Sequence, residues 1–269
     1  MDDTLFAKTL LELLDKQCGR TLPWPPKTLH DQVQYLAYAG RFLCPEYHFK
    51  WPQLAWPYSE AITALCKVYP QEWTGFNLDR RHNLMQMLRL IQNVPGDTAE
   101  CGVFEGVSSF LMHRYAPPYK KPRIHHMFDS FQGVSDPGEE DDGQHFPPNC
   151  LACSEEQVRE NLSRALEGDL SRMRFYKGWI PSRFSEVSDK VFAFVHIDVD
   201  LYEPTRDSIA FFYPRMAPGG IIVCDDYGYT TCPGATKAID SWLADKQEKM
   251  IPFASGGGFL IKGCVTARE

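Results

Sequence analysis

The sequence lacks the features that mark several large classes of protein. No apolar run reaches ~18 residues, so no transmembrane helix is predicted. The N-terminal stretch MDDTLFAKTLLELLDKQCG opens with acidic residues and continues with helical apolar spacing, which differs from a secretion signal. A formal net charge of -7 disfavours a nucleic-acid partner. Internal repeats and low-complexity tracts are also missing, so the composition is that of an ordinary globular protein.

Zinc-site and disulfide patterns are equally sparse among the nine cysteines. Cys150 and Cys153 have CxxC spacing, but a zinc site needs a second such pair or a histidine pair at ligand spacing, and the sequence has neither. The pair directly precedes the letters SEEQ, which are typical of a capping box at the start of a helix. An odd cysteine count without a secretion signal predicts reduced thiols and a cytoplasmic protein.

What the sequence does contain is a regular alternation of strand-like and helical segments in residues 94–269. This alternation favours an α/β fold with a Rossmann-like, doubly wound and mostly parallel sheet, covered by helices on both faces. The strands are expected at 98–103, 123–128, 173–176, 192–197, 220–224, 251–254 and 258–261, and the helices at 106–114, 154–166, 204–216 and 235–246.

Residues 1–93 have a different pattern, which predicts a helical N-terminal extension or lid on a domain of residues 94–269. Helical patterns at 5–17, 59–68 and 79–92 flank a Trp/Pro-rich segment at 44–58. That segment is expected either to wall a pocket or to form a small satellite core that packs the extension onto the sheet. The extension also offers a surface through which subunits could pair into a homo-oligomer.

The turn after the first strand, AECGVFEG, carries Gly102 and Gly106 but is not a pyrophosphate-binding turn. Such a turn needs a glycine where Phe104 stands. Glu100 at the strand end would repel phosphate and would suit a cationic ligand, such as the sulfonium and ammonium groups of S-adenosylmethionine. Asp129 ends the next strand and is placed to accept hydrogen bonds from ribose hydroxyls, which NAD also carries. An ordinary strand–helix turn is the remaining alternative.

Three carboxylates stand at the ends of two later strands. Asp198 ends one strand, and Asp225 and Asp226 end the next. Neighbouring parallel strands lie ~4.8 Å apart with their carboxyl ends at one edge, so these side chains are expected to crowd together. Like charges at such distances favour a cation between them, and all-oxygen ligands favour Mg²⁺, with Mn²⁺ or Ca²⁺ as alternatives. The other interpretation is that each aspartate caps a local turn or helix.

Five blocks of the sequence together resemble the macrocin O-methyltransferase family. They are TAECGVFEGVSSFLM, FDSFQG, SEEQVRENL, IDVDLYEPTRDSIAFFYPRMAPGGIIVCDDYG and CPGATKAIDSW, within about residues 94–245. The family comprises class I, S-adenosylmethionine- and Mg²⁺-dependent sugar O-methyltransferases of antibiotic biosynthesis, which include the mycinamicin and novobiocin enzymes. The resemblance implies that Asp198, Asp225 and Asp226 coordinate Mg²⁺. It also implies that the cofactor site is lined by Glu100, Gly102, Gly106 and Asp129, with Ser130 beside it.

The resemblance leaves two candidates for the general base. Asp200 follows Asp198 by two residues, as in the family's aspartate–x–aspartate, although Val199 replaces the glycine that the family usually has between them. His145 aligns with a family histidine and lies in the acidic loop 132–149, which could close over the site. An imidazole with a pKa near ~6.5 suits proton abstraction at neutral pH. The alternative for His145 is an exposed loop residue.

The resulting prediction is an S-adenosylmethionine- and Mg²⁺-dependent O-methyltransferase that acts on a hydroxyl of a sugar carried by a natural product. An acceptor with vicinal hydroxyls is expected, because two adjacent oxygens can bind one metal ion. The first alternative is a catechol or other phenolic acceptor. The second is a non-catalytic or NAD-type nucleotide-binding protein. Acceptor specificity is expected to reside in residues 20–76 and 132–149.

Overall fold

The structure is a computed structural model that describes residues 40, 55–74, 77–142 and 145–265. The chain divides into two compact units, Met1–Tyr58 and Ser59–Glu269. In the first unit, the described residues include one short 3-10 helix, η1 (Trp56–Tyr58). The predicted helix at 5–17 and the segment 44–54 lie outside the described residues, and the predicted boundary after residue 93 stays a prediction.

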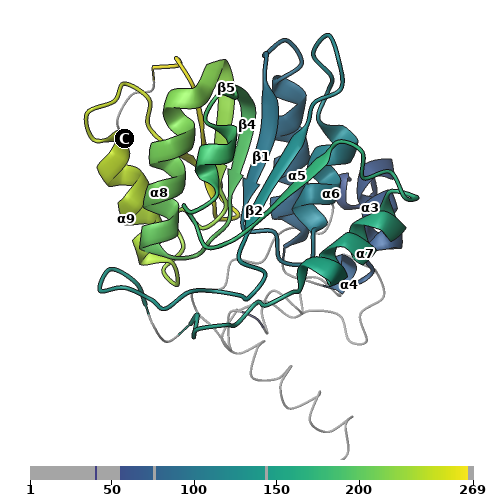
Figure 1. The fold of residues 1–269 in the computed structure, drawn as a ribbon, viewed down its shortest axis with the longest axis horizontal. Coiled ribbons are helices and arrows are strands. Elements are labelled where there is room, and N and C mark those ends of the chain that lie inside the picture. Colours follow the sequence, from purple (N-terminus) through teal and green to yellow (C-terminus); the bar gives the residue numbers. More distant parts are fainter. Residues whose placement is uncertain (1–39, 41–54, 75–76, 143–144, 266–269) are drawn as a thin grey trace, which may run out of the picture. The chain divides into compact units, whose positions relative to one another are not determined.

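The second unit is built on a seven-stranded sheet with the order β3-β2-β1-β4-β5-β7-β6 (Figure 1). Strands β1 to β5 pair in parallel, whereas β7 runs antiparallel to both β5 and β6. The predicted doubly wound, mostly parallel sheet is therefore confirmed. The strands are β1 (Asp97–Cys101), β2 (His125–Asp129), β3 (Met173–Lys177), β4 (Phe192–Ile197), β5 (Met216–Cys224), β6 (Ile251–Pro252) and β7 (Gly258–Ile261).

Helices cover both faces of this sheet (Figure 1). Helices α5, α6 and α7 lie on one face, and α8 and α9 lie on the other. The helix bounds are α3 (Glu60–Val68), α4 (Gln71–Thr74), α5 (Leu78–Leu90), α6 (Val107–Tyr115), α7 (Glu155–Ala165), α8 (Tyr202–Phe212) and α9 (Pro233–Leu243), with short 3-10 helices η2 (Phe184–Val187) and η3 (Tyr213–Arg215). Within the described part of the chain, every helix is too short or too polar to cross a bilayer.

Local sequence explains where helix α7 begins and where helix α8 ends. The side chain of Ser154 accepts a hydrogen bond from the backbone N–H of Gln157, so the predicted cap at the start of α7 is present. Helix α8 ends at Phe212, four residues before the predicted end, and the chain continues as the 3-10 turn η3. Pro214 has no backbone N–H to donate to the preceding turn, which explains the earlier end.

The core on the α8 side of the sheet is aromatic. Phe192 on β4 packs edge-on against Phe212 of α8, with ring centroids 5.0 Å apart, and Phe128 on β2 lies 5.8 Å from the same ring. All six residues of β4 are buried. Each buried phenylalanine contributes roughly 1.5–3 kcal/mol to folding. This packing fixes β4 in the centre of the sheet, and with it the position of the residues that follow β4.

Strand register brings the ends of three strands together. Cys101 of β1 pairs with Ile197 of β4, and Ile197 pairs with Cys224 of β5. The next residue after each of these is Gly102, Asp198 or Asp225. These three residues therefore leave the sheet side by side at its carboxyl edge.

Candidate active site

A cavity of about 530 Å³ opens at this carboxyl edge. Its wall combines the segments after β1, β2, β4 and β5 with the start of α5. One part of the wall is acidic, and another is apolar and includes Phe104, Leu151 and Trp179. The cavity lies where the strand order reverses between β1 and β4, which is the usual ligand position in an open α/β sheet.

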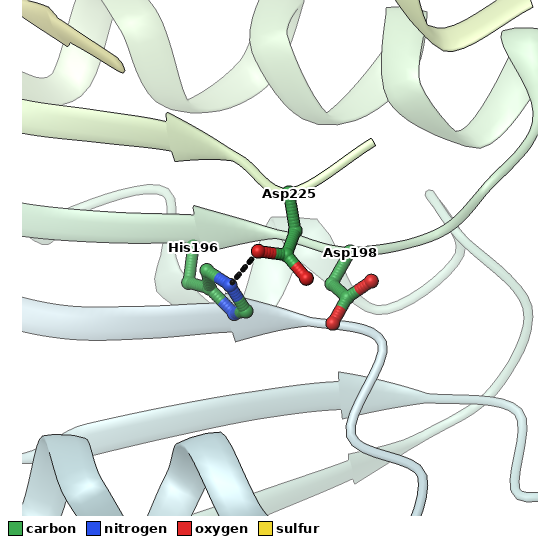
Figure 2. A group of neighbouring side chains, drawn as sticks. All are labelled: His196, Asp198 and Asp225. Carbon is green, nitrogen blue, oxygen red and sulfur yellow. Dashed lines mark ion pairs between the residues drawn. The ribbon is translucent and has the colours of Figure 1, made fainter. Parts of the chain in front are cut away.

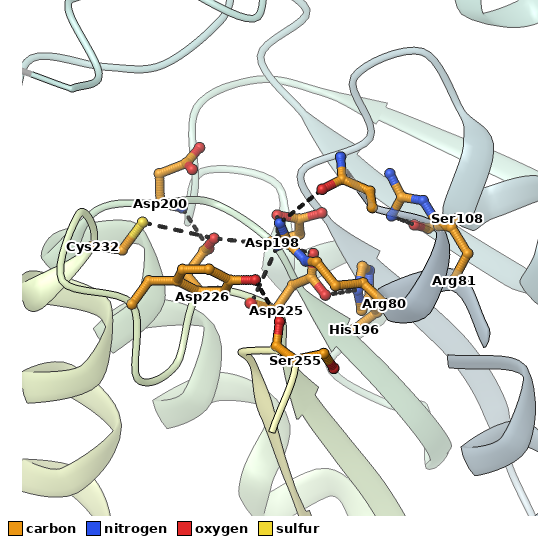
Figure 3. A network of polar contacts seen from close by, with 12 residues as sticks. Arg80, Arg81, Ser108, His196, Asp198, Asp200, Asp225, Asp226, Cys232 and Ser255 are labelled. Atoms are coloured by element: carbon orange, nitrogen blue, oxygen red, sulfur yellow. Dashed lines mark hydrogen bonds and ion pairs between the residues drawn. The ribbon is translucent and has the colours of Figure 1, made fainter. Parts of the chain in front are cut away.

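In the acidic part, the guanidinium of Arg80 lies among three carboxylates (Figure 3). Its Nη2 atom is 3.9 Å from Oδ1 of Asp198 and 3.8 Å from Oδ1 of Asp226, and it forms an ion pair with Oδ2 of Asp225. Nη2 also donates a hydrogen bond of 3.2 Å to the backbone carbonyl of Asp225. The three aspartates predicted to crowd together thus meet at one place, with an arginine as the cation between them. Asp198, Asp225 and Asp226 are called the acidic cluster below.

The carboxylate of Asp226 organises the loop that follows β4. Its Oδ2 atom accepts backbone hydrogen bonds from Val199 at 3.1 Å and from Asp200 at 2.8 Å, and its Oδ1 lies 3.9 Å from the thiol of Cys232. Asp200 has a φ of 61°, an uncommon backbone conformation for a residue other than glycine. The loop after β4 is therefore held in a strained conformation by the neighbouring strand end, and Asp200 lines the cavity.

The pKa values of the three aspartates shift in opposite directions. Burial, followed by the charge of Asp225, raises the pKa of Asp198 to about 6. Burial and the neighbouring carboxylates hold the pKa of Asp226 well above its usual range. Burial alone would raise the pKa of Asp225 as well, but the charge of Arg80 and the neighbouring His196, whose Nε2 lies 3.7 Å away, hold it well below its usual range. Arg80 therefore neutralises Asp225, while Asp198 and Asp226 bind protons more readily than ordinary aspartates do.

Glu100, at the end of β1, is buried and its carboxylate contacts three side chains. His196 Nδ1 lies 3.2 Å from Oε1, His125 Nε2 lies 3.5 Å from Oε2, and Ser109 donates a hydrogen bond to Oε2. Burial alone would raise the pKa of Glu100, but the neighbouring His125 and His196 lower it to about 2. Glu100 lines the cavity, yet its oxygens already contact protein groups.

His196 links Glu100 to the acidic cluster. While Nδ1 faces Glu100, Nε2 lies 3.7 Å from Oδ1 of Asp225 (Figure 2). Burial would lower the pKa of His196, but the neighbouring carboxylates of Asp225 and Glu100 raise it to about 10. A charged histidine on β4 thus joins carboxylates at the ends of β1 and β5.

The other residues expected at the cofactor site surround the turn after β1. Asp129 accepts backbone hydrogen bonds from Val103 at 2.6 Å and Phe104 at 3.3 Å on Oδ2, and from Phe131 at 2.6 Å on Oδ1. Ser130 donates to the carbonyl of Gly133. Gly102, Asp129 and Ser130 line the cavity, whereas Gly106 stands behind it as the N-cap of α6 with a φ of 88°.

Of the two candidates for the general base, His145 lies apart from the cavity. Its side chain is more than half exposed, and its Nδ1 atom lies 2.8 Å from Oδ2 of Asp142. The adjacent Phe146 lines the cavity, but His145 does not. Among the described residues, Asp200 therefore lines the cavity with the three aspartates, whereas His145 does not.

The roles of two residues of the site, Arg80 and His196, were not predicted from the sequence. Arg80 lies within a helical pattern beside a second arginine, Arg81, and its partners come from strands far away in the sequence, so nothing local signals its role. His196 did carry a signal, because a polar residue between Val195 and Ile197 interrupts a fully buried strand. A buried histidine in such a run needs a hydrogen-bond partner.

Within the described residues, two groups of side chains could hold a metal ion: His196, Asp198 and Asp225, and Asp200, Asp226 and Cys232. Both ring nitrogens of His196 face carboxylates as charged donors, so that ring is not available as a ligand. Oδ2 of Asp225 is buried, accepts no hydrogen bond from the described residues and faces the Arg80 cation. Asp198 and Asp225 belong to the first group and Asp226 to the second, but one carboxylate oxygen of each contacts or lies within 3.9 Å of the same Arg80 Nη2 atom. Such hard oxygen atoms are the ligands that a divalent ion such as Mg²⁺ prefers.

Comparison with known families gives one match that covers the site. The family model described as Macrocin-O-methyltransferase (TylF) matches residues 73–251, which include α5, the turn after β1 and all the aspartates of the acidic part.

Individual relatives agree with this match. The chain is 33% identical over 182 residues to demethyldecarbamoylnovobiocin O-methyltransferase of Streptomyces niveus, covering 64% of this chain and 68% of that protein. It is 33% identical over 172 residues to 8-demethyl-8-(2,3-dimethoxy-alpha-L-rhamnosyl)-tetracenomycin-C 4'-O-methyltransferase of Streptomyces olivaceus, covering 60% of this chain and 65% of that protein. The chain thus spans about two thirds of the length of these relatives. The solved structure of the O-methyltransferase NovP matches with a TM-score of 0.58 and 31% identity, over 69% of this chain and 80% of that one.

Proposed function

Because this chain belongs to the macrocin-O-methyltransferase family and is an S-adenosylmethionine-dependent O-methyltransferase, we propose that it methylates a sugar hydroxyl of a glycosylated natural product. The observation that carries the proposal is the position of the acidic cluster in the same cavity as Asp129. One wall of the cavity is thus suited to a cofactor with ribose hydroxyls, and the other to an acceptor with polar oxygens. The Streptomyces olivaceus relative is named as a 4'-O-methyltransferase of a rhamnosyl-bearing tetracenomycin, so its methylation is on a sugar.

S-adenosylmethionine supplies a methyl group on a positively charged sulfur, which activates that group for displacement. In this proposal the ribose lies against Asp129. Three backbone N–H groups occupy part of the Asp129 carboxylate, and a carboxylate has about four lone-pair sites, so at least one remains for a hydroxyl. Glu100 contributes negative charge at the cavity wall rather than a direct hydrogen bond, because its oxygens contact His125, His196 and Ser109.

We further propose that Asp198, Asp225 and Asp226 hold Mg²⁺. A bound divalent ion would lower the pKa of an adjacent sugar hydroxyl and fix its orientation. The chain's own contribution is to bring the three carboxylates together. Without a bound ion, Arg80 and His196 supply positive charge beside Asp225. The loop after β4, pinned by Asp226, sets the distance from this site to Asp200.

Asp200 is our choice as the general base. It lines the cavity two residues beyond Asp198, whereas His145 does not line it. In the protein without a bound ion, burial, followed by the charge of Asp198, raises the pKa of Asp200 to about 7. A divalent ion on Asp198 lowers that pKa, so the choice rests on the position of Asp200 in the cavity. In the transfer, the new oxygen–carbon bond forms as the carbon–sulfur bond breaks, and the hydroxyl proton passes to Asp200.

The test is a methylation assay with mass-spectrometric detection. The protein is given S-adenosylmethionine, Mg²⁺ and either glycosides with vicinal sugar hydroxyls or catechols, with and without EDTA. We expect methylation of a glycoside that EDTA abolishes, and a loss of about 10²–10⁴-fold in kcat for Asp200→Asn with unchanged cofactor affinity. Asp189→Asn, an exposed aspartate paired with Lys190, is the control and should behave as wild type.

Each part of the proposal can fail separately in this assay. Methylation of catechols alone would contradict the sugar acceptor, and full activity in EDTA would contradict the metal. An Asp200→Asn variant with wild-type kcat would return the base to His145, which the variant His145→Gln then tests.

A further inference from the structure

Arg80 occupies the position in the acidic cluster that the proposed function gives to a divalent ion (Figure 3). Four oxygen atoms surround its Nη2: one from each of the carboxylates of Asp198, Asp225 and Asp226, and the backbone carbonyl of Asp225. The side chain is largely buried, with 17% exposed, so the interaction is not a solvated surface ion pair. The guanidinium is thus the cation of the cluster in this structure.

The guanidinium fits this position incompletely. Nη2 carries two N–H groups, but four oxygen atoms surround it, and the 3.8 and 3.9 Å distances are too long for hydrogen bonds. The Nε atom of Arg80 is buried and, among the described residues, has no hydrogen-bond partner. A divalent ion accepts six or more oxygen ligands around one point, so it would satisfy these oxygens better than an amino group does.

Arg80 also contacts two residues that are not carboxylates. Its Nη1 atom lies 3.5 Å from Oδ1 of Asn77, and its guanidinium carbon lies 5.2 Å from the ring centroid of Tyr229. Asn77 and Tyr229 line the cavity together with Arg80. The side chain therefore has both a polar and an aromatic partner available on the cavity wall if it leaves the carboxylates.

We propose that Arg80 is an exchangeable internal cation, which holds Asp198, Asp225 and Asp226 together in the metal-free protein and moves out when a divalent ion binds. Two cations cannot share one point, and replacing one positive charge by two neutralises three carboxylates more completely. The inference rests on the metal site of the proposed function. Its consequence is that the protein binds metal more weakly than its carboxylates alone would allow, while the empty cluster remains stable.

The test is calorimetric titration of the EDTA-stripped and dialysed protein with MgCl₂ and with MnCl₂. We expect Arg80→Met, which keeps an unbranched side chain but removes the guanidinium and its charge, to bind the ion at least about tenfold more tightly than wild type. Arg80→Lys keeps a competing charge and should stay near the wild-type affinity. Arg89→Met removes an arginine from the exposed face of the same helix, where it contacts Gln86, and should match wild type.

Two further measurements separate exchange of the Arg80 side chain from simple electrostatic repulsion of the ion. Melting temperatures without metal should be lower for Arg80→Met than for wild type, and added ion should raise its melting temperature by more. Crystals grown with MnCl₂ should show the Arg80 guanidinium displaced from the carboxylates in the wild-type protein.

The outcomes distinguish this inference from the proposed function. Unchanged or weaker metal affinity in Arg80→Met, or an ion bound with the guanidinium still in place, overturns the inference while leaving the metal site intact. Absence of metal binding in all four proteins overturns the metal part of the proposed function and the inference with it. Metal binding by Arg80→Met alone supports the inference in its strongest form.

Discussion

At the scale of single residues, Gly102 shows how closely the site is built onto the sheet. Its φ of 84° is a conformation that residues with a side chain rarely adopt, and a Cβ atom there would lie 1.7 Å from the backbone oxygen of Asp198. We expect Gly102→Ala to lower the free energy of unfolding by more than about 3 kcal/mol, because the backbone of Asp198, a proposed metal ligand, would have to move. Urea denaturation measures this loss, and the methylation assay should show loss of activity in parallel.

Gly168 provides a matched control for that prediction. Its φ of 88° is nearly the same, but a Cβ atom there would meet nothing within 4 Å. Gly168→Ala should therefore cost only the backbone term, about 1 kcal/mol, and leave activity unchanged. Equal losses of stability in the two variants would mean that contact with Asp198 is unimportant.

The candidate site could be predicted from the sequence only where a residue's position follows from its strand. Asp198 and Asp225 end neighbouring strands in register, so their meeting followed from the apolar runs before them. Arg80 could not be predicted, because its position depends on how α5 packs against the sheet. The engagement of Glu100 also could not be predicted, since His125 and Ser109 come from other elements of the fold.

At the scale of elements, Asp141 connects the acidic loop to two helices. Its Oδ1 atom accepts a hydrogen bond of 2.8 Å from the backbone N–H of Tyr202 at the start of α8, where the N-cap residue Leu201 offers no side-chain acceptor. A Cβ atom on Gly234, in the first turn of α9, would lie 1.9 Å from the same oxygen. One carboxylate thus stands at two helix N-termini, where negative charge is stabilised.

We therefore expect Asp141→Ala to lower the free energy of unfolding by about 1–2 kcal/mol, because α8 loses its only side-chain cap among the described residues. Asp141→Asn keeps an oxygen acceptor and should lose less than half as much. Thermal denaturation followed by circular dichroism measures both. Asp136→Ala, in the same loop, is the control, and a control variant as unstable as Asp141→Ala would show that the effect belongs to the loop rather than to the cap.

The order and type of the elements were largely predictable, but some of their ends were not. Alternating apolar runs located every strand, whereas β5 begins at Met216, four residues before its predicted start. Pro218 and Gly219 argued against a strand there, but the neighbouring strands supply hydrogen bonds that override the local preference, such as Gly219 N–H to the carbonyl of Lys262. Tertiary pairing therefore decided what the local sequence could not.

At the scale of the whole molecule, charges buried in the sheet make stability depend on pH. The pKa of His196 is raised to about 10 in the folded protein, against ~6.5 in an unfolded chain. Between these values the folded state holds one proton more than the unfolded state. The stability that charged His196 contributes is therefore complete below ~6.5 and is lost as the pH rises toward 10. Glu100, whose pKa is lowered to about 2, contributes stability above ~4.3 that is lost only as the pH falls.

We expect the metal-free protein in EDTA to lose stability as the pH rises from 6.5 to 8, with a slope from His196 approaching about 1.4 kcal/mol per pH unit. The raised pKa values of Asp200 and Asp226 add a loss of the same sign. The difference between wild type and His196→Gln isolates the histidine, because glutamine keeps hydrogen-bonding groups but does not titrate. Urea unfolding at several pH values in this range measures both slopes. Equal slopes in the two proteins would mean that His196 is neutral in the folded state, and that the carboxylates of Glu100 and Asp225 are not joined by a charged histidine.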